Sequence, residues 1–109
     1  MKLTELVSLL RATGYPVAYS HFTATANNPV PKPPYITYLT PYTTNFRGDN
    51  RVIHKITNVD IELYTDKKDL EAEAIMEDLF DENEIPYDST ETYIESENVF
   101  QRIYEVRLI

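Results

Sequence analysis

The side chains best suited to acid–base chemistry are the carboxylates of residues 69–84, which occur in pairs three or four residues apart. Such a pair can supply a general acid and a general base where a cleft desolvates it. The same segment also carries a wide apolar stripe, and its acids fall mainly on the other side. The pairs are Asp69/Glu73, Glu73/Glu77, Asp78/Glu82 and Asp81/Glu84. We therefore predict ordinary solvated acids at these positions.

Few other side chains could do chemistry. His21 and His54, the two histidines, lie far apart in sequence and lack the spacing of a metal-binding pair. Ser20 and His21 are adjacent in a predicted strand, where neighbouring side chains point to opposite faces, so we expect no nucleophile–base pair. The absence of cysteine excludes disulfides and thiolate chemistry, and two glycines are too few for a phosphate-binding loop. The sequence predicts a protein that is not an enzyme and has no catalytic residue, metal site or cofactor.

The elements that carry these residues follow from hydrophobic periodicity. The apolar spacing of residues 3–13 and 66–83 predicts two helices, the first ended by Gly14 and Pro16 and the second capped by Thr65 or Asp66. Alternating patterns predict strands at residues 17–22, 35–40, 52–64, 87–96 and 99–108. We therefore predict an α+β fold formed by a single domain, residues 1–109. It has a mostly antiparallel five-stranded sheet with two helices packed on one face, in the order α-β-β-β-α-β-β.

Two polar segments are predicted to be long loops. Residues 25–34 hold four of the seven prolines, and residues 42–50 end in a Gly-Asp-Asn turn signal. Ordering such loops costs entropy, so loops of this kind are commonly functional. The nine tyrosines suit strand packing and protein interfaces about equally. The candidate protein-interaction residues are Asn28, Pro29, Val30, Pro31, Lys32, Tyr42, Asn45, Phe46, Arg47, Asp49 and Arg51.

The net charge of −8 is unevenly distributed. Residues 1–59 sum to +4, residues 60–97 to −13 and residues 98–109 to +1. Because the middle of the chain would repel a polyanion, tight nucleic-acid binding is disfavoured. The acids either form a solvated face that maintains solubility or give a polarised molecule whose basic surface meets an acidic one on a neighbouring copy.

The chain resembles small proteins encoded in the structural-gene region of tailed phages and prophages of Gram-positive bacteria. The resemblance is carried by residues 9–22, 33–39, 49–55, 61–69 and 91–97 and extends over nearly the whole chain. The predicted element order is also similar to that of the tail-terminator proteins, the tail-completion or head-to-tail joining subunits of long non-contractile tails. That family has no active site to carry over, and its assembly contacts lie on loops.

The resemblance implies a hexameric ring that caps the finished tail tube. Its partners would be other copies of itself, the tail tube protein and a head connector or stopper protein, with DNA passing through the ring; monomers in isolation are compatible with this role. The implied localisation is the host cytoplasm during assembly and then the virion tail. No apolar stretch is long enough for a membrane span, so no membrane partner is expected.

Three alternatives stay open. One is a head-completion or connector adaptor, and another is an intracellular protein-binding module that is unrelated to phages. The third, a small enzyme that uses the acidic helix, is the least favoured because the sequence shows no cleft chemistry.

Overall fold

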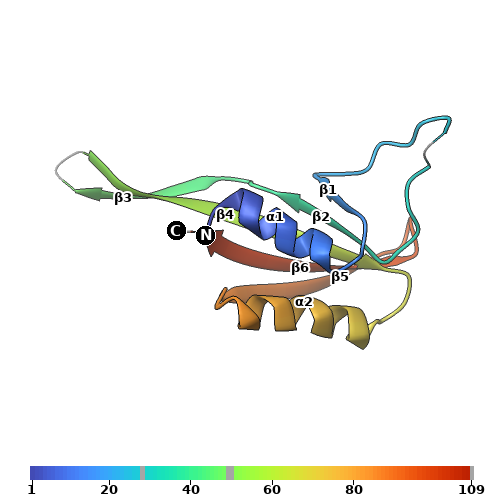
Figure 1. The fold of residues 1–109 in the computed structure, drawn as a ribbon. Helices are drawn as coiled ribbons and strands as arrows, with labels where there is room; N and C mark the ends of the chain where they lie inside the picture. Colours follow the sequence, from blue (N-terminus) through green and yellow to red (C-terminus); the bar gives the residue numbers. More distant parts are fainter. Residues whose placement is uncertain (28, 49–50, 109) are drawn as a thin grey trace.

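The computed structural model describes residues 1–27, 29–48 and 51–108, and for residues 44–48 and 51–55 it describes the backbone only. Within these ranges, neither helix combines the length and the apolar character that crossing a membrane requires. The described chain forms two helices and six strands (Figure 1). In chain order they are α1 (Leu3–Ala12), β1 (Val17–Tyr19), β2 (Tyr35–Leu39), β3 (Thr43–Gly48), β4 (Arg51–Thr65), α2 (Leu70–Glu82), β5 (Tyr87–Ile94) and β6 (Val99–Leu108).

Both helices end or begin where local chemistry requires it. Gly14 has φ +88°, the left-handed conformation that glycine adopts most readily, and so ends α1 as predicted. Helix α2 starts at Leu70 and not at residue 66 as predicted, because residues 66–69 form the connection from β4, which ends at Thr65. The residue that caps α2 is Asp69, whose Oδ1 accepts a hydrogen bond from the Ala72 amide at 3.0 Å, and not Thr65 or Asp66.

The main sheet has the strand order β1-β2-β4-β6-β5. Strands β1 and β2 are parallel, and the β2–β4, β4–β6 and β6–β5 pairs are antiparallel. The register places Ile36 opposite Leu63, and Ile61 opposite Tyr104. Because side chains alternate between the faces of a strand, these four residues share one face of the sheet.

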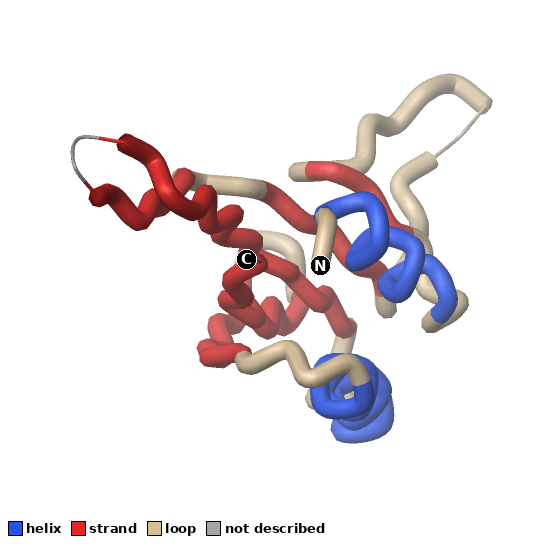
Figure 2. The backbone as a smooth tube through the Cα atoms, turned by 60° about the vertical axis from the view of Figure 1, so that its left-hand side comes forward, coloured by secondary structure: helices blue, strands red, loops and turns tan. Residues whose placement is uncertain are grey.

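Both helices cover that face (Figures 1 and 2). Leu6 and Leu10 of α1 and Met76 and Phe80 of α2 are fully buried in the same core cluster as the sheet residues Ile36, Val59, Ile61, Leu63, Tyr104, Val106 and Leu108. The core lies between the helices and the sheet, which leaves the opposite face uncovered by a helix. The predicted α+β class, the mostly antiparallel sheet and the helices on one face are confirmed.

Strand β3 was not expected, because residues 42–50 were predicted to form a loop. Residues 43–48 pair antiparallel with the first part of β4, from Thr43 opposite Thr57 to Gly48 opposite Arg51. The register shifts between Phe46 and Arg47, as it does at a β-bulge. Polar residues such as threonine, asparagine and arginine give no alternating pattern, so this strand depends on the pairing partner that β4 offers.

Candidate assembly surfaces

The two segments predicted to mediate assembly lie at opposite ends of the molecule. Strand β2 pairs with residues 60–64 of β4, whereas β3 pairs with the other end of β4, up to Thr57. Figures 1 and 2 agree that the loop between β1 and β2 and the β3–β4 hairpin point away from each other. The longest dimension of the molecule is 51 Å, close to the length of β4 at about 3.3 Å per residue. The structure therefore separates the two segments and does not combine them into one site.

The β3–β4 hairpin projects from the body of the protein as a two-stranded ribbon, defined here as Thr43–Gly48 with Arg51–Ile56. Pairing between β4 and β6 begins at Thr57, so among the described strands Arg51–Ile56 pair only with β3. Figure 1 shows the ribbon extending past both helices. An isolated two-stranded hairpin is marginally stable in water, so a projecting ribbon gains from an added partner.

The ribbon contains several of the predicted interaction residues. Asn45, Phe46 and Arg47 lie in β3, and Arg51 is the first residue of β4. The side chains of these four residues lie outside the described part of the structure, as does Asp49 altogether.

The base of the ribbon is anchored in the sheet. Ile56, which breaks the alternating pattern of β4, is only 3% exposed, and Asn58 beside it is 4% exposed. Both point to the helix-free face, whereas Val59 points to the core. Strand β4 is therefore buried on both faces near Ile56, and the register shift lies further along the hairpin.

Tyr42, another predicted residue, precedes the ribbon and is 59% exposed. Its carbonyl accepts a hydrogen bond from Asn58 Nδ2 at 3.4 Å. It also borders a groove of about 360 Å³ with Asp60, Asp88 and Glu105. Burial raises the pKa of the Asp60 carboxyl. Arg107 also lines this groove, so three acids and one base border it.

The loop at the other end remains a loop, as predicted. Pro29, Val30 and Lys32 are exposed, with Val30 at 43%, and Pro31 is half-buried, whereas Asn28 lies outside the described residues.

This loop lies over a row of aromatic rings on the helix-free face. Phe22 contacts Tyr35 edge-on at 5.4 Å between ring centroids, and Tyr35 stacks on Tyr64 at 4.9 Å. A cavity of about 230 Å³ lies here, bordered by Val30 and by Glu97 of the β5–β6 turn. The tyrosines of this region thus pack against one another and still border an open surface.

Ser20 and His21 correct one of the sequence predictions. Strand β1 ends at Tyr19, and Ser20 has φ +66°, so the alternation of side chains stops there. The hydroxyl of Ser20 lies 3.2 Å from His21 Nδ1 in a side-chain hydrogen bond, which the prediction of opposite faces had excluded. Both residues are exposed, so the pair lacks the desolvated setting in which a histidine activates a serine.

The Glu62 side chain and its hydrogen-bond partners lie between the row of aromatic rings and the groove. Glu62 Oε1 accepts a hydrogen bond from the Thr37 hydroxyl at 3.0 Å. Its Oε2 accepts hydrogen bonds from Gln101 Nε2 at 2.6 Å and from the Tyr64 hydroxyl at 3.4 Å. Burial raises the pKa of the Glu62 carboxyl, while these hydrogen bonds act in the opposite direction.

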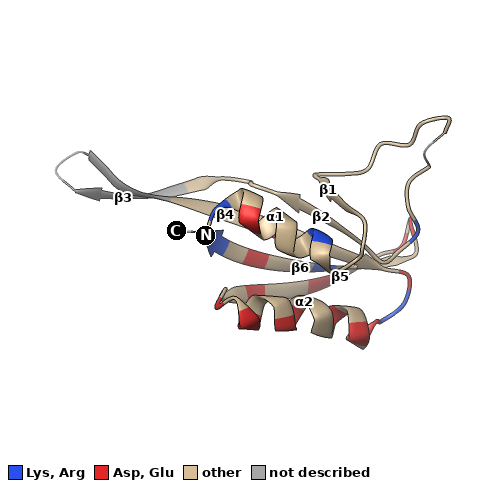
Figure 3. Ribbon diagram, in the orientation of Figure 1, with Lys and Arg blue, Asp and Glu red and all other residues tan. Residues whose placement is uncertain are grey.

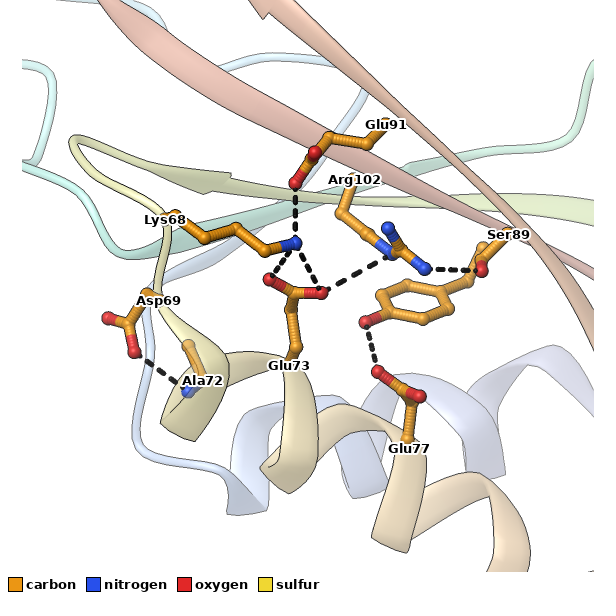
Figure 4. Close-up of polar contacts among 9 residues, drawn as sticks. Lys68, Asp69, Ala72, Glu73, Glu77, Ser89, Glu91 and Arg102 are labelled. Carbon is orange, nitrogen blue, oxygen red and sulfur yellow. Dashed lines mark hydrogen bonds and ion pairs between the residues drawn. The ribbon is translucent and has the colours of Figure 1, made fainter.

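Two acids of α2 are not solvated, contrary to the prediction. Glu73 is only 9% exposed and faces the sheet (Figure 4). Its Oε2 forms an ion pair with Lys68 Nζ at 2.9 Å, and its Oε1 lies 3.5 Å from Arg102 Nε. Lys68 Nζ also contacts Glu91 Oε1 at 2.8 Å, and Arg102 Nη2 donates a hydrogen bond to the Ser89 hydroxyl at 2.8 Å. The cluster joins α2 to β5 and β6.

Glu77 has a similar role one turn further along α2. It accepts hydrogen bonds from the hydroxyls of Tyr87 and Tyr104, both at 3.2 Å. Burial and the neighbouring Glu77 carboxylate raise the pKa of Tyr104 far above its usual range. Because the phenol stays protonated, it keeps donating to Glu77, and the two hydrogen bonds join α2 to β5 and β6.

The other acids of α2 lie on its outer side. Glu71, Asp78, Asp81 and Glu82 are exposed, as predicted for solvated carboxylates. Figure 3 shows acids along α2 and on β5 and β6. In the described ranges, no three histidine or acidic side chains are grouped so as to hold a metal ion. Comparisons with protein-family models, with curated proteins and with solved structures found no match to this chain.

Proposed function

We propose that this protein is a structural subunit of a phage or prophage tail that acts as a tail terminator. Copies of it would form a ring that caps the tail tube and joins it to the head connector. The observation that carries the proposal is the projecting ribbon, in which Arg51–Ile56 pair with β3 and with no third strand in the described part of the chain. Ordering such a ribbon costs conformational entropy that its few contacts in a solitary domain do not offset, whereas in an assembly the ribbon can gain a pairing partner.

The placement of the two candidate segments also supports a ring. The ribbon and the 25–34 loop lie at opposite ends of the molecule (Figure 1). A contact between two different patches, one from each of two neighbouring subunits, is heterologous. Repeated heterologous contacts form a closed ring when the rotation from one subunit to the next returns to the first subunit. A symmetric dimer, in contrast, uses one patch twice.

The charge distribution agrees with a channel for DNA. The segment from residue 60 to 97 carries a charge of −13. Like charges repel, so acids that face the lumen of a ring would keep DNA from binding as it passes.

A head-completion or connector adaptor is the nearest alternative, because such a protein would use the same ribbon and loop to bind its neighbours at a different position in the virion. An intracellular protein-binding module is the other alternative, and a stable symmetric dimer would favour it.

Electron microscopy of a phage that carries an altered gene tests the role directly. The alteration replaces residues 45–55 with an Asn-Gly turn, so that the paired residues Thr44 and Ile56 close a short hairpin. We expect heads and tails to accumulate unjoined, with tails of abnormal length. Joined particles with tails of normal length would contradict the proposal. Full heads that leak DNA beside tails of normal length would indicate the connector adaptor.

A further inference from the structure

Strand β5 forms one edge of the sheet and leaves a long row of backbone groups open. It is eight residues long and pairs with β6 on one side. On its other side no strand pairs with it in the described part of the chain. The six consecutive residues from Asp88 to Tyr93 are all exposed. An open edge of this length is a template for pairing with another chain.

The opposite edge of the sheet is protected. Strand β1 has only three residues, and Ser20, with its positive φ, turns the chain away directly after it. Short edge strands are one of the usual means by which proteins prevent unwanted pairing. The sheet therefore has one closed edge and one edge that is ready to accept a strand.

The ribbon of a second copy has the properties that this edge requires. Strand β3 has six residues, and among the described strands it pairs on one side only, with β4. The segment from residue 43 to 56 contains Arg47, Arg51 and Lys55 against a single acid, Asp49, for a net charge of +2. Residues 87–98, which form β5 and the turn after it, contain four acids and no base, for a net charge of −4. Opposite charges on the two segments favour this pairing.

We infer that β5 of one subunit binds β3 of a second copy of this chain as an added strand. The inference rests on the proposed function and specifies the contact between neighbours in the ring. Backbone hydrogen bonds would provide the affinity, and the basic ribbon against the acidic edge would provide the specificity. Pairing of β5 with β5 of another copy is disfavoured, because it would bring acids together.

Disulfide cross-linking tests the contact, since the chain has no cysteine of its own. Single-cysteine variants Thr44→Cys in β3 and Thr92→Cys in β5 are mixed at millimolar concentration and oxidised, and the products are identified by mass spectrometry. The matched control replaces the β5 site with Ala74→Cys, an exposed position on α2. We expect about tenfold more mixed disulfide from the β3–β5 pair than from the control pair, because proximity raises the effective concentration. Asn45→Cys, at the alternate side-chain position of β3, is tested against the same Thr92→Cys variant and covers the other register.

A charge test accompanies the cross-linking. Lys55→Glu in the ribbon should weaken self-association measured by sedimentation about tenfold, the effect of about 1.4 kcal/mol. Asp88→Lys should restore part of the loss in the double variant. Lys67→Glu makes the same change of net charge at an exposed site outside both strands and should leave association unchanged. Circular dichroism spectra and melting curves show that each variant is folded.

The results of the cross-linking and charge tests either support the inference or overturn it. An excess of mixed β3–β5 disulfide, together with the loss and recovery of association, supports it. Oligomers whose cross-links join β5 to β5 or β3 to α2 overturn the inference and leave the proposed function standing. Protein that stays monomeric at millimolar concentration overturns the inference as well, while the phage experiment decides the proposed function separately.

Discussion

Replacing residues 45–55 with an Asn-Gly turn should separate folding from assembly. Pairing between β4 and β6 starts at Thr57, and the new turn closes on Thr44 and Ile56, so the main sheet keeps its register. A two-stranded hairpin contributes little on its own. We therefore expect the free energy of unfolding to fall by about 1 kcal/mol or less, which lowers the Tm by less than about 8 °C.

The effect on association should be much larger. A six-residue strand that joins an antiparallel ladder exchanges about one backbone hydrogen bond per residue with its partner. At about 1 kcal/mol net for each bond, the ladder contributes about 6 kcal/mol. If half of that remains after the cost of ordering the ribbon, its loss raises the Kd of self-association about a hundredfold.

The assay is sedimentation velocity across a concentration series, with thermal unfolding of the same samples. The control variant is Lys67→Glu, which changes an exposed residue outside both strands and leaves the ribbon and the acids of residues 87–98 intact. It should keep the wild-type association. Wild-type association in the 45–55 variant, with a normal melting curve, would refute the reasoning, because it would mean that the ribbon does not hold the subunits together.

Three further predictions concern the fold itself. Asp69→Ala removes the acceptor for the Ala72 amide and should cost about 1 kcal/mol in urea unfolding, whereas Asp69→Asn, which can still cap, should cost much less. Phe80→Ala should cost about 3–5 kcal/mol, because the ring is fully buried, and a near-normal Tm would show that the cavity collapses. For Glu62, burial raises the pKa of the carboxyl in the folded state above its ordinary value of 4.5. The folded protein therefore binds this proton more tightly than the unfolded chain does, so the contribution of Glu62 to stability should grow as the pH falls through the raised pKa and level off below 4.5. Glu62→Gln should remove that part of the pH dependence, and parallel stability–pH curves for the two proteins would contradict the assignment.

Much of the fold could be predicted from hydrophobic periodicity. Val59, Ile61 and Leu63 alternate with polar residues and predict the core face of β4, and all three are buried. Gly14 predicts the end of α1 through its positive φ. These signals are local, because one residue type or one short pattern is sufficient to predict the conformation of the segment that contains it.

The errors arise where a distant partner determines the structure. Residues 43–48 have no alternating pattern and become a strand because β4 is long enough to pair with them. Glu73 lies in an acidic run, yet Lys68 and Arg102 allow it to be buried by providing opposite charge. The error at Ser20 is different, because its cause is local: the positive φ of this residue ends the strand and brings its hydroxyl to the adjacent His21.

For the candidate assembly surfaces, the sequence predicted residues 25–34 and 42–50 as two separate segments but could not place them in the fold. Pro29, Val30 and Lys32 are exposed on a loop, and they remain candidate contact residues. That this loop and the ribbon lie at opposite ends follows from the pairing of β2 and β3 with different parts of β4. No pattern within either segment contains that information.

The position of β6 affects how the subunit is made. It is the last strand of the sheet in chain order, yet it lies between β4 and β5 and buries Tyr104 and Val106. While the ribosome is still adding this strand, β4 and β5 have nothing between them, and the core is incomplete. A chain that breaks off before β6 would therefore leave an unfolded product for proteases to remove, rather than a nearly complete subunit.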